Sequence, residues 1–101
     1  NDILSRTERP TAIITAQDLM AIQLMETAKS KGLRIPDDLA VTGFDNTIMS
    51  KLYNPPLTTV GNPYEEIAAQ IIELLMNKLS KKEDLPRVIK LKPEIIFRKS
   101  L

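Results

Sequence analysis

Apolar residues along this chain form short continuous runs that alternate with longer segments of helical period, which predicts strands alternating with helices. The pattern predicts strands at 11–15, 39–43, 57–60, 87–91 and 94–97, and full helices at 17–31 and from 63 to about 79. Residues 1–8 are typical of the tail of a helix, and 45–53 predict a loop with room for one helical turn. Such alternation favours parallel pairing with right-handed crossovers.

The first predicted helix has one clear apolar stripe and two apolar residues outside it. The stripe that should face the sheet is made of Met20, Ala21, Leu24, Met25 and Ala28, and Gly32 gives a natural stop. Leu19 and Ile22 fall outside the stripe. They are either scattered surface residues or part of a contact between subunits.

The second predicted helix starts at Asn62-Pro63-Tyr64-Glu65, with Asn62 as N-cap and Pro63 as first helical residue. Its apolar arc is broader than one sheet face requires, so we expect it to pack against two partners. The arc consists of Ile67, Ala68, Ala69, Ile71, Ile72, Leu74, Leu75, Met76 and Leu79. Two full helices cannot cover both faces of three to five strands. The sequence therefore predicts an α/β unit that belongs to a larger doubly wound sheet or self-associates.

Composition excludes several classes of function. The chain has 101 residues, one domain or a piece of one, and a net charge of +1 that gives no nucleic-acid-binding footprint. It has no cysteine and no histidine, so thiol nucleophiles, zinc–thiolate sites and the commonest general base are missing. No apolar run is long enough to span a membrane, and no phosphate-binding or nucleophile motif occurs. We expect no enzyme, no cofactor and no metal site.

The candidate ligand residue is Asp45, which follows the predicted strand at 39–43. Open parallel sheets bind small molecules in the crevice at the carboxyl ends of their strands. A carboxylate accepts two hydrogen bonds there, which suits the adjacent hydroxyls of a sugar or a ribose. Gly43 removes side-chain bulk beside it. The alternative is that Asp45 caps the next turn.

Several segments in fixed order give the chain a family resemblance. They are Arg9-Pro10-Thr11-Ala12-Ile13, Asp18-Leu19-Met20-Ala21-Ile22, Gly32-Leu33-Arg34-Ile35-Pro36-Asp37-Asp38-Leu39, Val41-Thr42-Gly43-Phe44-Asp45-Asn46, Pro55-Pro56-Leu57-Thr58-Thr59-Val60, Pro93-Glu94-Ile95-Ile96 and Arg98-Lys99-Ser100. In this order they resemble the LacI/GalR (lactose-repressor-like) transcription regulators. The resemblance implies a partial periplasmic-binding-protein-like (type I) fold, in which two α/β lobes clasp a small molecule.

The resemblance also implies how residues 1–101 are organised, as the C-terminal portion of an effector-binding domain. Residues 9–56 would belong to the lobe distal to DNA, 57–62 to a crossover, 63–86 to the proximal-lobe helix, and 87–101 to the final crossover and strands. The DNA-binding headpiece lies outside this chain, so we expect contact with DNA only through that headpiece.

Further site residues follow from the resemblance. Gln17 stands where the family often has a polar residue that reaches the effector, although an N-cap or surface role is the alternative. Asn62 aligns with a polar hinge residue, although capping would explain it. Phe44 packs either under the ligand or in the core. Asp18 is expected to stabilise the amino end of the helix, where the helix dipole favours a negative charge. The positions that resemble the dimer face are Leu19, Ile22, Met25 and Tyr53.

The predicted function is effector sensing in a cytoplasmic, homodimeric regulator that binds a small sugar-like or nucleoside-like metabolite. The alternative is a sugar-binding protein of a transport system with the same fold. The isolated chain should associate or be marginally stable, because its sheet is incompletely covered.

Overall fold

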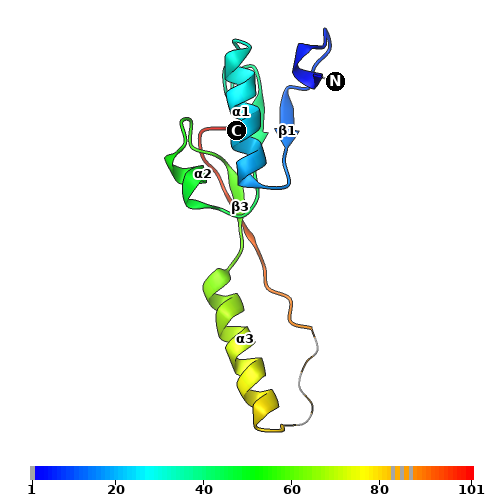
Figure 1. The fold of residues 1–101 in the computed structure, drawn as a ribbon, viewed down its shortest axis with the longest axis vertical. Coiled ribbons are helices and arrows are strands. Elements are labelled where there is room, and N and C mark those ends of the chain that lie inside the picture. Colours follow the sequence, from blue (N-terminus) through cyan, green and yellow to red (C-terminus); the bar gives the residue numbers. More distant parts are fainter. Residues whose placement is uncertain (1, 83, 85, 87) are drawn as a thin grey trace. The chain divides into compact units, whose positions relative to one another are not determined.

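The computed structural model describes residues 2–82, 84, 86 and 88–101, which form two compact units. Unit 1 runs to Gly61 and also includes Ile95–Leu101, whereas unit 2 is Asn62–Glu94. The elements in chain order are the 3-10 helix η1 (Ile3–Ser5), β1 (Ala12–Ile14), α1 (Asp18–Ser30), β2 (Ala40–Thr42), α2 (Ile48–Leu52), β3 (Thr59–Gly61), α3 (Tyr64–Leu79) and β4 (Glu94–Ile96) (Figure 1). The predicted alternation of strands and helices is confirmed.

The parallel pairing that the alternation predicts is found between β1 and β2 and at the approach of β2 to the segment before β3. β1 pairs with β2 in the register Ala12↔Ala40 to Ile14↔Thr42, and a parallel bridge joins Thr42 to Thr58. Beyond the bridge, the Gly43 amide donates to Thr58 O at 2.9 Å, so the ladder continues from β2 toward β3. β3 pairs in turn with β4.

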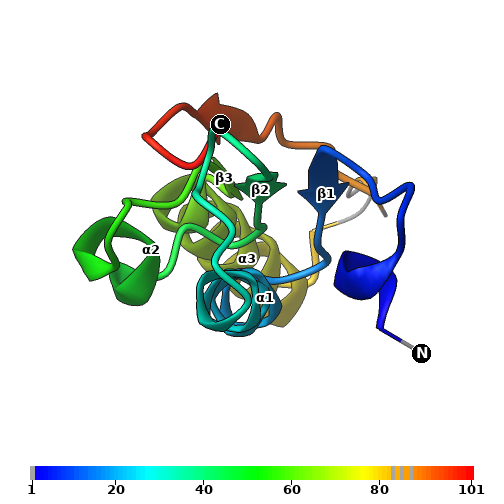
Figure 2. The same ribbon diagram turned by 90° about the horizontal axis from the view of Figure 1, so that it is seen from above.

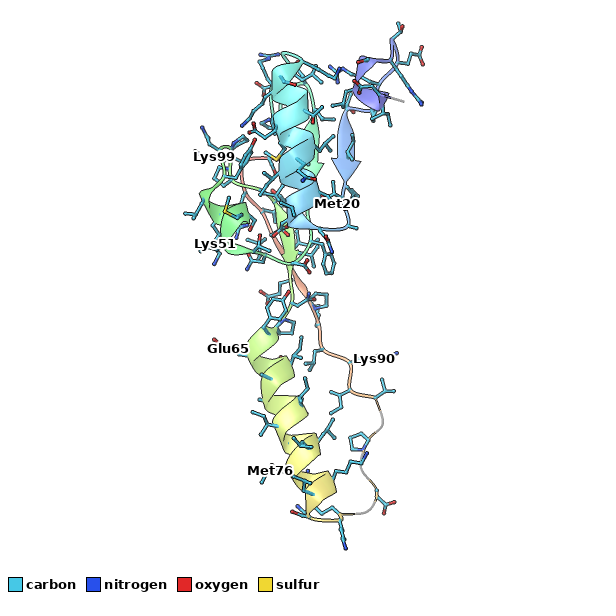
Figure 3. All side chains as sticks on the ribbon, viewed as in Figure 1. Met20, Lys51, Glu65, Met76, Lys90 and Lys99 are labelled. Atoms are coloured by element: carbon cyan, nitrogen blue, oxygen red, sulfur yellow. The ribbon has the colours of Figure 1, made fainter. Side chains whose placement is uncertain are left out.

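Helix α1 covers one face of these strands (Figure 2). The core beneath it consists of Leu4, Ala21, Met25, Ala28, Leu39, Val41 and Leu57. Burying each of the larger side chains contributes about 1.5–3 kcal/mol, so this small cluster is the main source of stability in unit 1. The predicted stripe is confirmed for Ala21, Met25 and Ala28. It is wrong for Met20, labelled in Figure 3, which is 51% exposed.

Helix α1 ends where Gly32 predicts that it should. Gly32 adopts φ 80°, a left-handed conformation that favours glycine. Its amide donates to Lys29 O at 2.9 Å, and the Leu33 amide donates to Ala28 O at 3.0 Å. These bonds satisfy carbonyls that the last helical turn would leave without partners.

The opposite face of the strands is uncovered within unit 1. Ile14 is 85% exposed and Phe97 is 73% exposed, although both are large and apolar. The expectation of an incompletely covered sheet is therefore confirmed for the described residues.

Unit 2 consists mainly of α3, which has no buried residue. Exposed apolar side chains occur on much of its circumference: Tyr64, Ile71, Ile72, Leu75, Met76 (labelled in Figure 3) and Leu79. This agrees with a helix whose apolar arc needs partners beyond unit 2. The predicted N-cap is wrong, because α3 begins at Tyr64 with Pro63 in the capping position and no side-chain cap.

Two other predictions at the chain's flanks are wrong. The first residues form a single 3-10 turn, η1, in which the Asp2 carboxylate accepts a hydrogen bond from the Leu4 amide at 3.1 Å, rather than the tail of an α-helix. The predicted edge strand at 87–91 is not a strand where the structure describes it, at 88–91, and Arg87 lies outside the described residues. Alternating polarity without a hydrogen-bonded neighbour does not make a strand.

Candidate functional site

Polar and aromatic side chains gather at the carboxyl ends of β1 and β2. Ile14 and Thr42 are register partners, and Gln17 and Asp45 each follow three residues later, so the parallel pairing brings them to the same edge. A hydrogen bond of 2.9 Å from the Asp18 amide to Phe44 O joins the two segments directly. Three of the residues predicted for ligand binding, Gln17, Phe44 and Asp45, thus share one edge of unit 1.

Asp45 lies in a turn with an unusual backbone. Asp45 has φ 107° and Asn46 has φ 51°, and both values are uncommon for residues other than glycine. The Asp45 amide donates to Val60 O at 2.8 Å, which anchors the turn to β3, and Asp45 is partly buried. Strained non-glycine residues of this kind cluster at ligand sites, where surrounding structure holds them in place.

Gly43 is required by the packing beneath this turn. A Cβ added there would meet Asp18 Oδ1, and it would lie 2.9 Å from Leu57 Cδ2 and 3.0 Å from Asp18 Cα. The predicted absence of bulk is confirmed, although its reason is the close approach of α1 and Leu57.

Asp18 has a larger role than the predicted effect on the helix end. It is 1% exposed, and its carboxylate accepts three hydrogen bonds. The Thr47 amide and hydroxyl donate to Oδ2 at 2.7 and 2.9 Å, and the Thr59 hydroxyl donates to Oδ1 at 2.5 Å. Asp18 therefore joins α1, the start of α2 and β3 on one side of the Asp45 turn. Sequence reasoning missed this because the partners are 29 and 41 residues away.

Arg98 holds the other side of the turn. Its Nη2 donates to Asn46 Oδ1 at 2.7 Å, and its Nη1 donates to Ser50 Oγ at 2.9 Å and to Leu57 O at 2.8 Å. The motif Arg98-Lys99-Ser100 carried part of the family resemblance, but no role followed from it. The partners of Arg98 can be found only once the fold brings them together.

The aromatic and amide side chains at this edge are accessible. Phe44 is 37% exposed and lies outside the core cluster, so the core interpretation is wrong. Gln17 is exposed and occupies the N-cap position of α1 without making a side-chain cap hydrogen bond. Both side chains can therefore face a ligand in solution.

Asn62 belongs to unit 2. Its amide nitrogen donates to the Tyr64 hydroxyl at 3.4 Å, and it does not cap α3. The capping explanation that competed with a ligand role is thereby removed, and ligand contact by Asn62 stays a prediction.

The four residues predicted for a subunit interface lie in different environments. Leu19 is 63% exposed, Ile22 is partly buried against the core, and Met25 is fully buried. Met25 therefore cannot present a surface to another subunit. The partly buried Tyr53 hydroxyl donates to Glu26 Oε1, and Lys29 Nζ lies 4.3 Å from the Tyr53 ring centroid. Burial, and then the hydrogen bond to Glu26, raise the pKa of the Tyr53 hydroxyl above its ordinary value.

Helix α2 supplies an exposed apolar surface that the sequence pattern did not single out. Ile48 is 65% exposed, Met49 52% and Leu52 71%. α2 packs against α1, so this surface adjoins the α1 side of unit 1.

A hollow of about 360 Å³ lies along the uncovered strands, but its lining does not suit a sugar. Most lining residues are apolar, including Ile14, Phe44, Phe97 and Leu101. Orienting a polar ligand requires well-placed polar groups. The polar residues that line this hollow are threonines, whereas the Asp45 edge carries a carboxylate and an amide.

Among the residues that the structure describes, no cluster of three or more carboxylate side chains could hold a metal ion. Within the same described ranges, no helix is both long and apolar enough to cross a bilayer.

Residues 2–101 match the family model of the periplasmic binding protein-like domain. The chain belongs to this family. Together with the repressors and solved regulators described next, the match confirms the resemblance to an effector domain of LacI/GalR-type regulators.

Curated relatives and solved structures agree. The HTH-type transcriptional repressor PurR of Photobacterium profundum is 38% identical over 101 residues, which is 100% of this chain and 30% of that repressor. The PurR repressor of Pasteurella multocida is 36% identical over the same shares. A LacI family regulator from Lactobacillus casei with bound glucose has a TM-score of 0.84 and 28% identity, covering 98% of this chain and 36% of that one. The chain thus spans less than a third of the length of these curated relatives.

Proposed function

We propose that this chain is the part of a LacI-type transcription regulator that senses a small polar metabolite. Unit 1 would belong to the lobe distal to DNA and unit 2 to the proximal lobe, with residues 57–62 and 87–101 carrying the crossovers. DNA would be bound by a headpiece outside this chain, and the regulator would act in the cytoplasm. The proposed role is binding, not catalysis.

The observation that carries the proposal is the placement of Asp45. Its carboxylate follows β2 at the carboxyl edge of a parallel sheet, in a turn whose strained backbone is held by neighbouring elements. Phe44 and Gln17 add an accessible ring and an amide at the same edge. A carboxylate for paired hydroxyls, an amide and an aromatic face are together suited to a sugar or nucleoside.

The ligands bound to solved members of the family support the same class of ligand. A LacI family regulator from Lactobacillus casei with this fold has been solved with bound glucose and with bound sucrose. These two structures are 28% and 27% identical to this chain. A ligand that bridges two lobes would stabilise one closure angle, and it would regulate only through its different affinity for the open and closed states.

We also propose that the regulator is a homodimer. Leu19 and the α2 residues Ile48, Met49 and Leu52 offer exposed apolar side chains in unit 1. These are the residues that we expect at the subunit contact, with Ile22 and Tyr53 beside them and Met25 excluded by its burial.

The test is calorimetric titration of the intact regulator with glucose, sucrose, adenosine and guanosine, followed by the same titrations of Asp45→Asn. Each hydrogen bond to a charged acceptor contributes about 1.5–3 kcal/mol, and the amide keeps one oxygen acceptor, so losing the other bond should weaken binding at least about tenfold. Asp37→Asn is the matched control, because Asp37 is exposed and lies before β2 rather than after it. Unchanged affinity in Asp45→Asn would exclude this site. If none of the four compounds binds, the ligand class is wrong.

A further inference from the structure

The guanidinium of Arg98 is surrounded by acceptors from three parts of unit 1. It donates to the side chain of Asn46, to the hydroxyl of Ser50 in α2, and to the carbonyl of Leu57 before β3, all at 2.7–2.9 Å. The planar fork of arginine can serve such a set of acceptors at once, whereas lysine would act from a single nitrogen.

The backbone of Arg98 is anchored as firmly as its side chain. The Arg98 amide donates to Thr58 Oγ1 at 2.8 Å, and the same hydroxyl donates to Arg98 O at 3.1 Å. Thr58 is 1% exposed. The guanidinium therefore extends toward the turn from a fixed point on the strands.

What Arg98 holds is the strained part of the proposed site. Asn46, its partner, has φ 51°, and Asp45 beside it has φ 107°. Such conformations persist only where surrounding contacts determine them. Asn46 is also confined from the β3 side, since its Cβ and Nδ2 lie 3.4 and 3.5 Å from the place where a Gly61 Cβ would stand.

From this geometry we infer that Arg98 is a positioning residue for the effector carboxylate. By holding Asn46, it keeps the Asp45–Asn46 turn in the one conformation that presents the Asp45 carboxylate at the strand ends. The guanidinium acts through Asn46 and does not itself contact ligand. This inference rests on the proposed function of Asp45 and assigns a second residue to that site.

The first experiment measures the turn without any ligand. Hydrogen–deuterium exchange of Arg98→Gln in the intact regulator should be at least about tenfold faster at the Asp45 amide, which bonds Val60 O in the native turn. The Ala40 amide, bonded to Thr11 O between β1 and β2, should be unchanged. Lys99→Gln is the control, because Lys99 is adjacent and exposed. Equal acceleration at Ala40, or none at Asp45, would overturn the inference.

The second experiment separates positioning from general support of the fold. The probe is whichever of glucose, sucrose, adenosine and guanosine binds the intact regulator most tightly. Arg98→Gln should weaken its binding about tenfold when Asp45 is present, but less than about twofold in an Asp45→Asn background, because coupled residues are not additive. The same loss in both backgrounds would show that Arg98 does not act through Asp45.

The two proposals can fail separately. If Asp45→Asn leaves the affinity unchanged, the proposed ligand site is wrong, and the exchange rates still decide whether Arg98 holds the turn. If Asp45→Asn weakens binding and Arg98→Gln does not, the site stands and the inference about Arg98 is overturned.

Discussion

Replacing Asp18 by alanine removes the acceptor on which three hydrogen bonds of unit 1 converge. The donors are the amide and hydroxyl of Thr47 and the hydroxyl of Thr59, at 2.5–2.9 Å. Thr59 is 1% exposed, so its hydroxyl cannot turn to solvent without local opening.

The cost can be worked from these contacts. A hydrogen bond to a charged group contributes about 1.5–3 kcal/mol, and a buried donor that loses its acceptor costs about 1–3 kcal/mol. The three bonds share one carboxylate and are not additive, so Asp18→Ala should destabilise unit 1 by about 4 kcal/mol. Asp18→Asn keeps the shape and one oxygen acceptor, and it should cost about 1–2 kcal/mol.

Hydrogen exchange at the Val41 amide measures this free energy within unit 1, because that amide of β2 donates a hydrogen bond to Ser100 O in the segment after β4. About 4 kcal/mol corresponds to a loss of protection of roughly 1,000-fold, since each 1.4 kcal/mol is a factor of ten. Thr59→Val is the matched control, which removes one of the three bonds. A loss of less than tenfold for Asp18→Ala would refute the role assigned to this carboxylate.

Three further outcomes follow from the structure. Gly43→Ala should destabilise unit 1 by about 2 kcal/mol, measured by the same exchange, because the added Cβ meets the backbone of Asp18 at 3.0 Å. Hydrogen bonds from Arg34 hold the pKa of Asp38 at about 2, below its ordinary value, so their contribution is present above about pH 4 and is lost as the pH falls toward 2. Asp38→Asn should flatten this part of the curve of unfolding midpoint against pH, and an unaltered curve would contradict it. Leu52→Lys should shift the intact regulator toward monomer in analytical ultracentrifugation, since Leu52 is 71% exposed, and an unchanged dimer would exclude α2 from the contact.

The sequence was sufficient for features that depend on local pattern. The period of α1, its stop at Gly32, and the continuous run of β2 each follow from neighbouring residues, and the structure confirms them. The strand-end rule sufficed to single out Asp45, whereas Gln17 followed from the family resemblance, and the parallel register of β1 and β2 brings both to one edge.

Features that depend on distant partners could not be predicted. The role of Asp18 requires Thr59, 41 residues away, and that of Arg98 requires Asn46, 52 residues away. Met25 illustrates the same limit. Its helical phase predicted burial, whereas the family resemblance suggested a subunit contact, and the structure resolves the conflict in favour of burial.

The hydrogen bonds of Ser100 determine when unit 1 can complete its folding during synthesis. Its hydroxyl donates to Val41 O at 2.6 Å and accepts from the Thr58 amide at 2.8 Å. Because 95–101 complete unit 1 only after 62–94 have been synthesised, a ribosome must finish the intervening segment before this unit can close. Until then the nascent chain lacks the partners that Ser100 gives to backbone groups of Val41, Pro56 and Thr58, which makes early release or truncation near position 100 a hazard for the whole unit.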